Sequence, residues 1–273
     1  MNAAEQIALL IRDTSTSLPE DVEVALKKAM RREDADSAAR MILKTILDNC
    51  ALARKEVSPL CQDTGTLTFF INSSLRRRFS KQVVEKGVRI ATKNGYLRKN
   101  VIDPISGFSY DDNCADGAPA IHYCDKPGIT LIMKGGGSEN MSRQYSLPDS
   151  SLGAGRDMAG VRKCILDAVV KAQGYGCAPG VLGVCIGGDR ATGYEVAKEQ
   201  LLRPLDDKAQ GELDRFESKL LKEANSLGIG PMGLGGKTTL LGIKIASKAR
   251  VPASFFVTIA YMCWAARRRT VLV

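Results

Sequence analysis

The stretch "GIGPMGLGGKTTLLG", residues 228–242, decides between two classes of fold. Its Gly236, Lys237 and Thr238 match the end of a phosphate-binding loop, which would indicate a nucleotide-binding fold. That motif also needs a glycine at the position of Pro231, and proline has no backbone N–H to offer a phosphate. We therefore interpret the stretch as a glycine-rich turn between a helix and a strand.

The sequence on both sides of this turn predicts the secondary structure. Helices are expected at the N-terminus and over 19–32, 36–55, 79–95, 158–173, 191–203 and 206–227. Strands are expected over 66–70, 119–123, 129–134, 180–188, 238–246 and 255–263, and a polar loop is expected after the glycines at 135–137 as far as about 156. This pattern predicts an α+β fold with glycine-rich loops gathered at one side, in one domain over 1–273 whose first part, to about 58, is helical.

The composition limits where the protein works. Hydrophobic residues make up 44% of the 273 residues, which is enough for a globular core. The longest nearly continuous apolar run, 255–266, is too short to cross a bilayer, which takes about 20 residues. Because the N-terminus carries acidic residues and no basic-then-apolar signal, we expect a cytoplasmic location without a membrane partner.

The net charge of +9 and two arginine triplets, 76–78 and 267–269, raise the question of nucleic-acid binding. Aromatic residues make up only 5% of the chain, and none is interleaved with the triplets as a base-stacking surface requires. We therefore expect no nucleic-acid partner. The positive charge fits an anionic small substrate or an acidic partner subunit, and solvated surface charge is the simplest interpretation of each triplet.

The eight cysteines are expected to be free thiols, because disulfides are rare in the cytosol. No C-x-x-C pair occurs, so a metal site would have to be assembled from distant segments. Three loops combine a cysteine with unusual polar or glycine neighbours, at Cys61, Cys177 and Cys263. Cys185 is an equally good candidate by local chemistry, so spacing does not choose between them.

Several motifs together resemble a known family. In chain order they are "CQDTG", "YLRKNVIDP", "KGGGSEN", "GCAPG" with "GVCIGG", "GIGPMGLGGKTT" and "PASFFVTIAYMCWAARR". They resemble the α subunit of the oxygen-sensitive, iron–sulfur class I fumarate hydratases and tartrate dehydratases. The resemblance runs in collinear order from about residue 5 to the C-terminus.

The resemblance implies a [4Fe–4S] cluster held by three cysteines, with one iron left free to act as a Lewis acid on the substrate. The family motifs place the ligands at Cys61, Cys177 and Cys263. Cys185 occupies a position where glycine is usual in the family, and it is expected to be a packed thiol. The glycine-rich turn is then a scaffold near the active site.

The same resemblance assigns the substrate site. Asp63 is the expected catalytic carboxylate, and Gln62 the amide beside it. Arg98 is expected to bind a substrate carboxylate through its planar fork. Gly135, Gly136 and Gly137 are expected to let backbone amides approach the dicarboxylate.

The chain departs from the family pattern at two places. Val251 stands where family members commonly have histidine, and Cys114 stands where no thiol is expected. The single histidine, His122, is expected to be a satisfied core residue. Cys50 and Cys164 are expected to pack in helices.

The function implied is the reversible hydration of fumarate to (S)-malate. L-tartrate dehydration and a catalytically altered, cluster-binding homologue are the alternatives. Single-chain family members carry a further domain that supplies a general base, and this chain ends at Val273. We therefore expect a separate β subunit and an α2β2 assembly.

Overall fold

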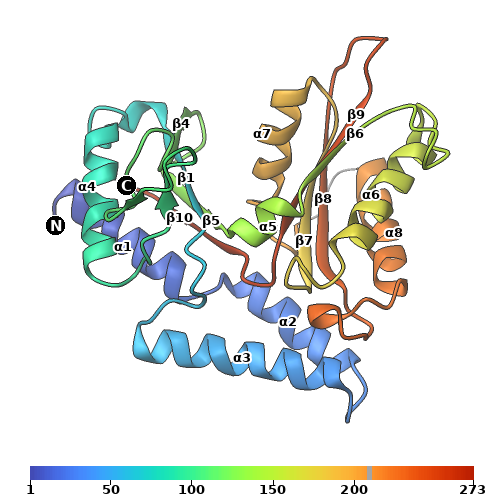
Figure 1. Ribbon diagram of the computed structural model, residues 1–273, viewed down its shortest axis with the longest axis horizontal. Helices are drawn as coiled ribbons and strands as arrows, with labels where there is room; N and C mark the ends of the chain where they lie inside the picture. Colours follow the sequence, from blue (N-terminus) through green and yellow to red (C-terminus); the bar gives the residue numbers. More distant parts are fainter. Residues whose placement is uncertain (208–210) are drawn as a thin grey trace. The chain divides into compact units, whose positions relative to one another are not determined.

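The structure is a computed structural model that describes residues 1–207 and 211–273 (Figure 1). The chain divides into two compact units, each with its own mixed sheet. The first unit contains Met1–Pro19, Asp48–Gly136 and Ala265–Val273, and the second contains Glu20–Leu47 and Gly137–Trp264. The chain therefore leaves the first unit twice, after Pro19 and within the predicted glycine loop, and it returns at Asp48 and directly after the "CW" of the C-terminal motif.

The sheet of the first unit has the strand order β10-β5-β1-β4. Its strands are β1 (Thr66–Asn72), β4 (Ala120–Cys124), β5 (Ile129–Lys134) and β10 (Arg267–Val271). Strand β1 runs parallel to β4 and antiparallel to β5, and β10 runs antiparallel to β5. All six residues of β5 are buried, as expected for a strand with neighbours on both sides.

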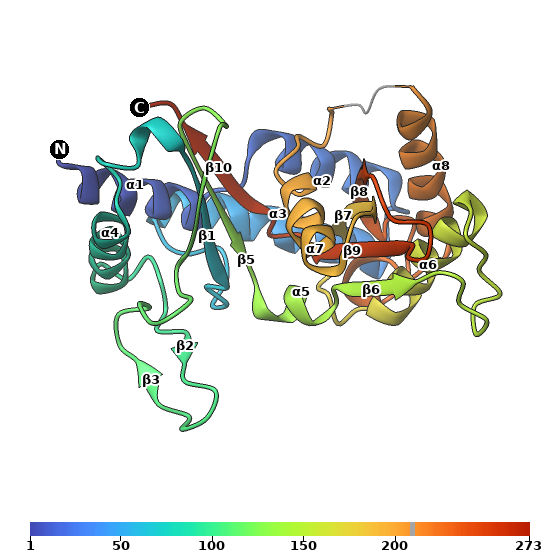
Figure 2. The ribbon, with the colours of Figure 1, turned by 90° about the horizontal axis from the view of Figure 1, so that it is seen from above.

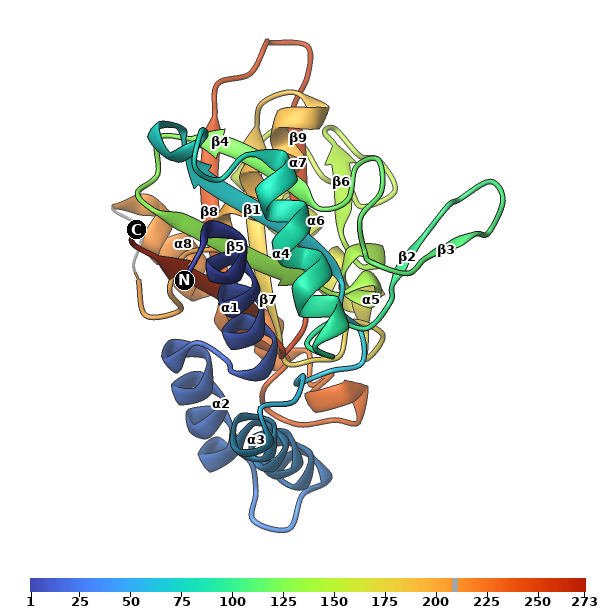
Figure 3. The same cartoon turned by 90° about the vertical axis from the view of Figure 1, so that its left-hand side faces the viewer.

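Two helices, α1 (Ala3–Thr16) and α4 (Lys81–Lys93), cover one face of this sheet (Figure 3). Helix α1 begins with a capping box, in which Asn2 and Glu5 each bond the other's backbone N–H. A Cβ on Gly87 would lie 2.5 Å from the Ile7 side chain, so glycine lets the two helices pack closely. A short hairpin of β2 (Val101–Ile102) and β3 (Ser109–Tyr110) extends from this unit (Figure 2).

The sheet of the second unit has the order β6-β9-β7-β8. Its strands are β6 (Arg143–Ser146), β7 (Gly180–Gly187), β8 (Leu240–Lys248) and β9 (Phe256–Met262). Helix α7 (Arg190–Gln200) lies on one face, and α6 (Met158–Ala172) and α8 (Glu212–Ser226) lie on the other (Figure 1). Successive residues of β7 face opposite sides of the sheet, which explains this layering. Leu182 packs with α6 and α8, whereas Gly183 lies against Ala197 of α7.

The remaining helical elements are α2 (Glu20–Arg32), α3 (Ala38–Glu56), α5 (Gly136–Asn140) and the short 3₁₀ turns η1 (Ser73–Leu75) and η2 (Pro231–Gly233). None of the helices in the described residues is long and apolar enough to cross a membrane.

The α+β prediction is confirmed, and most predicted elements lie within a few residues of their expected ends. The predicted helix over 206–227 is shorter, as α8, and 208–210 of its range lie outside the described residues. The predicted polar loop after the glycines is wrong at its start, where α5 and β6 form. Strand β10 was also not predicted, because its sequence, "RRRTV", has no apolar alternation.

Candidate active site

Cys177 lies in a strained loop that leads into β7. Its backbone has φ +52°, a left-handed conformation that side chains other than glycine seldom adopt, and its side chain is exposed. Gly176 and Gly180 flank this position, and a Cβ on either would lie within 2.5 Å of the Tyr261 ring. The loop thus wraps a buried tyrosine, which requires glycine on both sides of Cys177.

The glycine-rich turn packs directly against this loop. The N–H of Met232 donates to the carbonyl of Ala178 at 3.0 Å, and a Cβ on Gly174 would lie 2.3 Å from the Met232 carbonyl oxygen. Within the turn, a Cβ on Gly230 would lie 1.9 Å from the Gly235 oxygen. These close backbone approaches explain the density of glycines and make the turn a support for the Cys177 loop.

The end of the turn that resembles a phosphate-binding loop contacts a carboxylate of the chain itself. The N–H of Lys237 donates to both oxygens of Glu33, at 3.1 and 2.9 Å. Glu33 is only 3% exposed, and a Cβ on Gly236 would lie 3.2 Å from one of its oxygens. Glu33 thus occupies the position of an anion at this amide.

Cys263 is held next to the Cys177 loop. The N–H of Trp264 donates to the carbonyl of Cys177 at 3.1 Å. The N–H of Cys263 itself donates to the hydroxyl of Ser138 at 3.1 Å, and Ser138 directly follows Gly137 in α5. The second unit therefore brings together Cys177, Cys263 and the last of the three predicted glycines.

Tyr261 of β9 interacts electrostatically with both thiols. It is 2% exposed, and burial, followed by the nearby charges of Cys263 and Cys177, raises the pKa of its phenol. Its hydroxyl therefore stays protonated beside the two sulfurs. Neither composition nor spacing marks this residue in the sequence.

The first unit carries the other predicted residues on adjoining loops. The N–H of Asp63 donates to the sulfur of Cys61 at 3.4 Å. A Cβ on Gly135 would lie 2.8 Å from Oδ2 of Asp63, and one on Gly136 would lie 3.9 Å from it. The Asp63 carboxylate therefore rests against the backbone of the predicted glycine loop, and Gln62 beside it is exposed.

Arg98 is tied to the same loop by its backbone. Its N–H donates to the hydroxyl of Thr64 at 2.8 Å, and that hydroxyl also donates to the Arg98 carbonyl at 3.2 Å. The Arg98 side chain is exposed. The first unit thus brings together Cys61, Asp63, Gly135 and Arg98, and Thr64 is a contact that the sequence analysis missed.

Arg267 corrects the interpretation of the second arginine triplet as solvated surface charge. Its side chain is 1% exposed, because it lies on β10 opposite Met133 of the fully buried β5. Its Nη2 donates to the carbonyl of Asp63 at 2.7 Å. Surface charge is confirmed for the first triplet, Arg76–Arg78, where all three side chains are exposed.

Most of the remaining thiols are packed. Cys50 and Cys164 are buried in helices as predicted, and burial raises the pKa of each to about 11. Cys185 is fully buried in β7, where burial also raises its thiol pKa. Cys114 is 9% exposed, and its thiol donates to the Glu85 carbonyl at 3.6 Å.

The expectation that His122 is a core residue is wrong. It lies on β4, which has one neighbour in its sheet, and its side chain is exposed and stacks on Phe70 at 5.2 Å between ring centroids. A strand at the edge of a sheet has no neighbouring strand on one side. Sequence periodicity alone does not show which strand lies at the edge. Val251 is 64% exposed, in the segment between β8 and β9.

The three candidate cluster ligands are among the four cysteines that are not buried, and Cys124 is the fourth. Accessible thiols suit an inorganic ligand, whereas the other four are enclosed by side chains. Cys61 belongs to the first unit and the other two candidates to the second. Among residues 1–207 and 211–273, no group of three or more cysteine, histidine or acidic side chains is placed to hold a metal ion.

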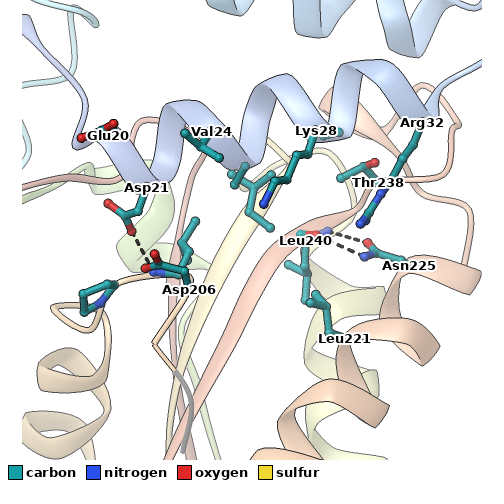
Figure 4. Close-up of a pocket in the computed structure, with 15 residues that line it drawn as sticks. Glu20, Asp21, Val24, Lys28, Arg32, Asp206, Leu221, Asn225, Thr238 and Leu240 are labelled. Atoms are coloured by element: carbon teal, nitrogen blue, oxygen red, sulfur yellow. Dashed lines mark hydrogen bonds between the residues drawn. The ribbon is translucent and has the colours of Figure 1, made fainter.

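A groove of about 670 Å³ lies elsewhere in the second unit (Figure 4). It is lined by α2, by the start of β8 and by Asn225 of α8, whose carboxamide is already bonded to Thr239 and Leu240. None of the predicted site residues lines it.

The chain is similar to proteins of one family over nearly its whole length. It is 48% identical to "Putative fumarate hydratase class I" of Geobacillus stearothermophilus, over 97% of this chain and 53% of that protein. It is 34% identical to "Putative L(+)-tartrate dehydratase subunit alpha" of Methanocaldococcus jannaschii, over 98% of this chain and 96% of that protein. It is 29% identical to L(+)-tartrate dehydratase subunit alpha of Escherichia coli K12, over 95% of this chain and 86% of that protein.

The chain thus spans about half the length of the first of these relatives and most of the length of the other two. The family model for fumarate hydratase (fumerase) matches residues 4–272, which include every cysteine loop and glycine loop described above. With the motifs in order and the match almost complete, the chain belongs to the fumarate hydratase (fumerase) family.

Proposed function

We propose that the chain is the α subunit of a [4Fe–4S]-dependent hydro-lyase that reversibly hydrates fumarate to (S)-malate. The observation that carries the proposal is the bond from the Trp264 N–H to the Cys177 carbonyl, which joins two cysteine loops that lie far apart in the sequence. Cys61, on the loop that also carries Asp63, is the proposed third ligand. Family membership supports the same reaction class.

The residues present suit such a cluster. Cys61, Cys177 and Cys263 are accessible thiols, and the sulfur of Cys61 already accepts a backbone N–H bond, as a thiolate does readily. When bound, a cluster with three protein ligands supplies an open iron that acts as a Lewis acid toward substrate oxygens.

The chain's own groups bind and orient the dicarboxylate in this proposal. Arg98 offers a planar fork of N–H donors to one carboxylate, and its exposed side chain is free to reach it. The backbone amides of Gly135–Gly137 approach without obstruction by side chains, and Gln62 supplies an amide donor.

Asp63 is the proposed acid–base group. Hydration adds a hydroxyl to one alkene carbon and a proton to its neighbour, and the substrate undergoes no net oxidation or reduction. A carboxylate beside the substrate hydroxyl can hold its proton or orient it. The Asp63 backbone carbonyl is held for this role by the Arg267 guanidinium, and the absence of a side chain on Gly135 leaves room for its Oδ2.

We propose a separate β subunit and an α2β2 assembly. The M. jannaschii and E. coli relatives are named as alpha subunits and are close to this chain in length, whereas this chain covers 53% of the G. stearothermophilus relative. The cytoplasmic location stays a prediction.

L(+)-tartrate dehydration is the second candidate. The names of the M. jannaschii and E. coli relatives, which this chain matches over most of their length, favour it. A cluster-binding homologue with altered catalysis is the third, and it rests on Val251 in place of the histidine common in the family. Anaerobic reconstitution of the chain with its β subunit, followed by assays on fumarate, malate and tartrate, separates the three. Activity on none of them would contradict the hydro-lyase proposal.

The cluster ligands can be tested with matched cysteine variants. Cys177→Ser should abolish the cluster's visible absorbance after reconstitution, because one ligand is lost. Cys185→Ser should keep it, because that thiol is enclosed in β7. In the first unit, Cys61→Ser should likewise abolish the cluster's absorbance, and Cys124→Ser should keep it. Retention of the cluster in Cys177→Ser together with its loss in Cys185→Ser would reassign the middle ligand.

A further inference from the structure

We propose that Thr64 is a positioning residue that holds Arg98 in place beside the Asp63 loop. The inference rests on the proposed function, because it concerns how the carboxylate-binding arginine is placed. Thr64 is 4% exposed, so its hydroxyl is enclosed by protein. It accepts the Arg98 N–H at 2.8 Å and donates to the Arg98 carbonyl at 3.2 Å.

A single hydroxyl therefore satisfies both backbone groups of Arg98. Arg98 lies in a segment without helix or strand, between α4 and β2, so neighbouring strands offer its backbone no partners. Enclosed backbone groups without partners are costly, and a hydroxyl is the smallest side-chain group that can both accept and donate. The β-branched side chain of threonine also restricts χ1, which fixes where the hydroxyl lies.

Asn113 anchors the same segment through its carboxamide. It is 2% exposed, its Nδ2 donates to the Arg98 carbonyl at 2.9 Å, and its Oδ1 accepts the Asn100 N–H at 2.8 Å. The backbone of Arg98 is thus held at two points, while its guanidinium group remains exposed. This arrangement fixes the base of the side chain and leaves its end free for a ligand.

The contact between Thr64 and Arg98 connects two parts of the proposed substrate site. Thr64 directly follows Asp63, so the hydroxyl joins the loop with the proposed acid–base group to a residue 34 positions away. If Arg98 had to be ordered only when substrate binds, the entropy of ordering would weaken binding. We therefore expect loss of the hydroxyl to raise KM more than it lowers kcat.

The test uses the reconstituted enzyme with its β subunit. Thr64→Val removes the hydroxyl at nearly constant volume and should raise KM for the dicarboxylate by about tenfold, with kcat changed by less than about threefold and cluster absorbance unchanged. Thr64→Ser keeps the hydroxyl and should restore KM to within about threefold of the wild type. Thr66→Val makes the same chemical change at an exposed position and should leave both constants unaltered. An unchanged KM in Thr64→Val, or equal damage in Thr64→Ser, would overturn the proposal.

Hydrogen exchange separates this inference from the proposed function, because it needs no activity. In the chain without its β subunit, the Arg98 amide should exchange about tenfold faster in Thr64→Val than in the wild type or in Thr64→Ser. Faster exchange in an enzyme inactive on every dicarboxylate would reject the function and keep the anchoring role. Unchanged exchange would reject the anchoring role itself.

A second variant serves if Thr64→Val does not fold. Asn113→Asp keeps the oxygen that accepts the Asn100 N–H and replaces the nitrogen that donates to the Arg98 carbonyl. Asparagine and aspartate both tolerate the left-handed backbone found here, with φ +58°. This variant should also raise KM with little effect on kcat, and a wild-type KM would contradict the proposal.

Discussion

The N–H of Trp264 donates to the carbonyl oxygen of Cys177 at 3.1 Å, so residues that are 87 positions apart in the sequence are joined by a backbone bond. One residue earlier, the N–H of Cys263 donates to Ser138 of α5. Both candidate cysteines of the second unit are therefore held by hydrogen bonds that do not use their sulfur atoms.

Ser138→Ala should make a reconstituted cluster less durable. The substitution removes the acceptor of the Cys263 N–H in a site where Ser138 is 3% exposed, and an unpaired buried N–H costs about 1–3 kcal/mol. Cluster absorbance followed in air should decay several-fold faster than in the wild type. Ser146→Ala, at an exposed position of β6, is the control, and equal decay rates in the two variants would contradict the role of Ser138.

Gly135→Ala and Gly137→Ala should have different effects on turnover. A methyl group at 135 would lie 2.8 Å from Oδ2 of Asp63 and must displace that carboxylate, so kcat should fall by about tenfold to a hundredfold. A methyl group at 137 meets nothing within 4 Å, so the fold accommodates it. It would obstruct only the approach of the dicarboxylate to the backbone amides, so KM should rise and kcat should not change. Steady-state kinetics check both, and wild-type kcat in Gly135→Ala would remove Asp63 from the proposed chemistry.

Glu33→Ala should destabilise the glycine-rich turn by about 1–3 kcal/mol, because the Lys237 N–H loses its carboxylate acceptor in a buried site. Asp34→Ala removes the neighbouring carboxylate, whose ion pair with the Lys237 ammonium is exposed, and should cost less than about 1 kcal/mol. Urea unfolding of both variants measures the difference. Equal losses would mean that Glu33 does not support the turn.

Alkaline pH should destabilise the protein through its buried thiols. Burial raises the pKa of Cys164 from 9.0 to about 11. Between these values the thiol ionises in the unfolded chain but stays protonated in the folded one, so the unfolded chain binds fewer protons and stability falls as pH rises. The stability contributed by the protonated thiol is complete below pH 9 and is lost as the pH rises through about 11.

Cys164→Ala should therefore show a smaller loss of unfolding free energy between pH 8 and pH 10 than the wild type, by up to about 1.4 kcal/mol per pH unit above the unfolded pKa. Val161→Ala, a buried substitution in the same helix, creates a cavity without removing an ionisable group and should lower stability equally at both pH values. The same pH slope in Cys164→Ala and wild type would contradict the predicted ionisation.

The strongly periodic segments were predictable. Helices α1, α4 and α6 carry apolar residues at helical spacing, and β7 is a continuous apolar run, so pattern alone placed them. Strand β10 was not predictable, because Arg267 is buried only through its pairing with β5 and its bond to Asp63. His122 was misplaced for the related reason that sequence does not show which strand lies at a sheet edge.

The sequence by itself determined the family and the kinds of residue available for chemistry, because side-chain identity and motif order do not depend on folding. Only the tertiary structure decided why glycines flank Cys177, since the Tyr261 ring that excludes other side chains comes from a different strand. It likewise decided that Thr64 holds Arg98 and that Glu33 meets the Lys237 amide. A hydrogen bond or close contact requires atoms within a few ångströms, and residues 34 or 204 positions apart come so close only after the chain has folded.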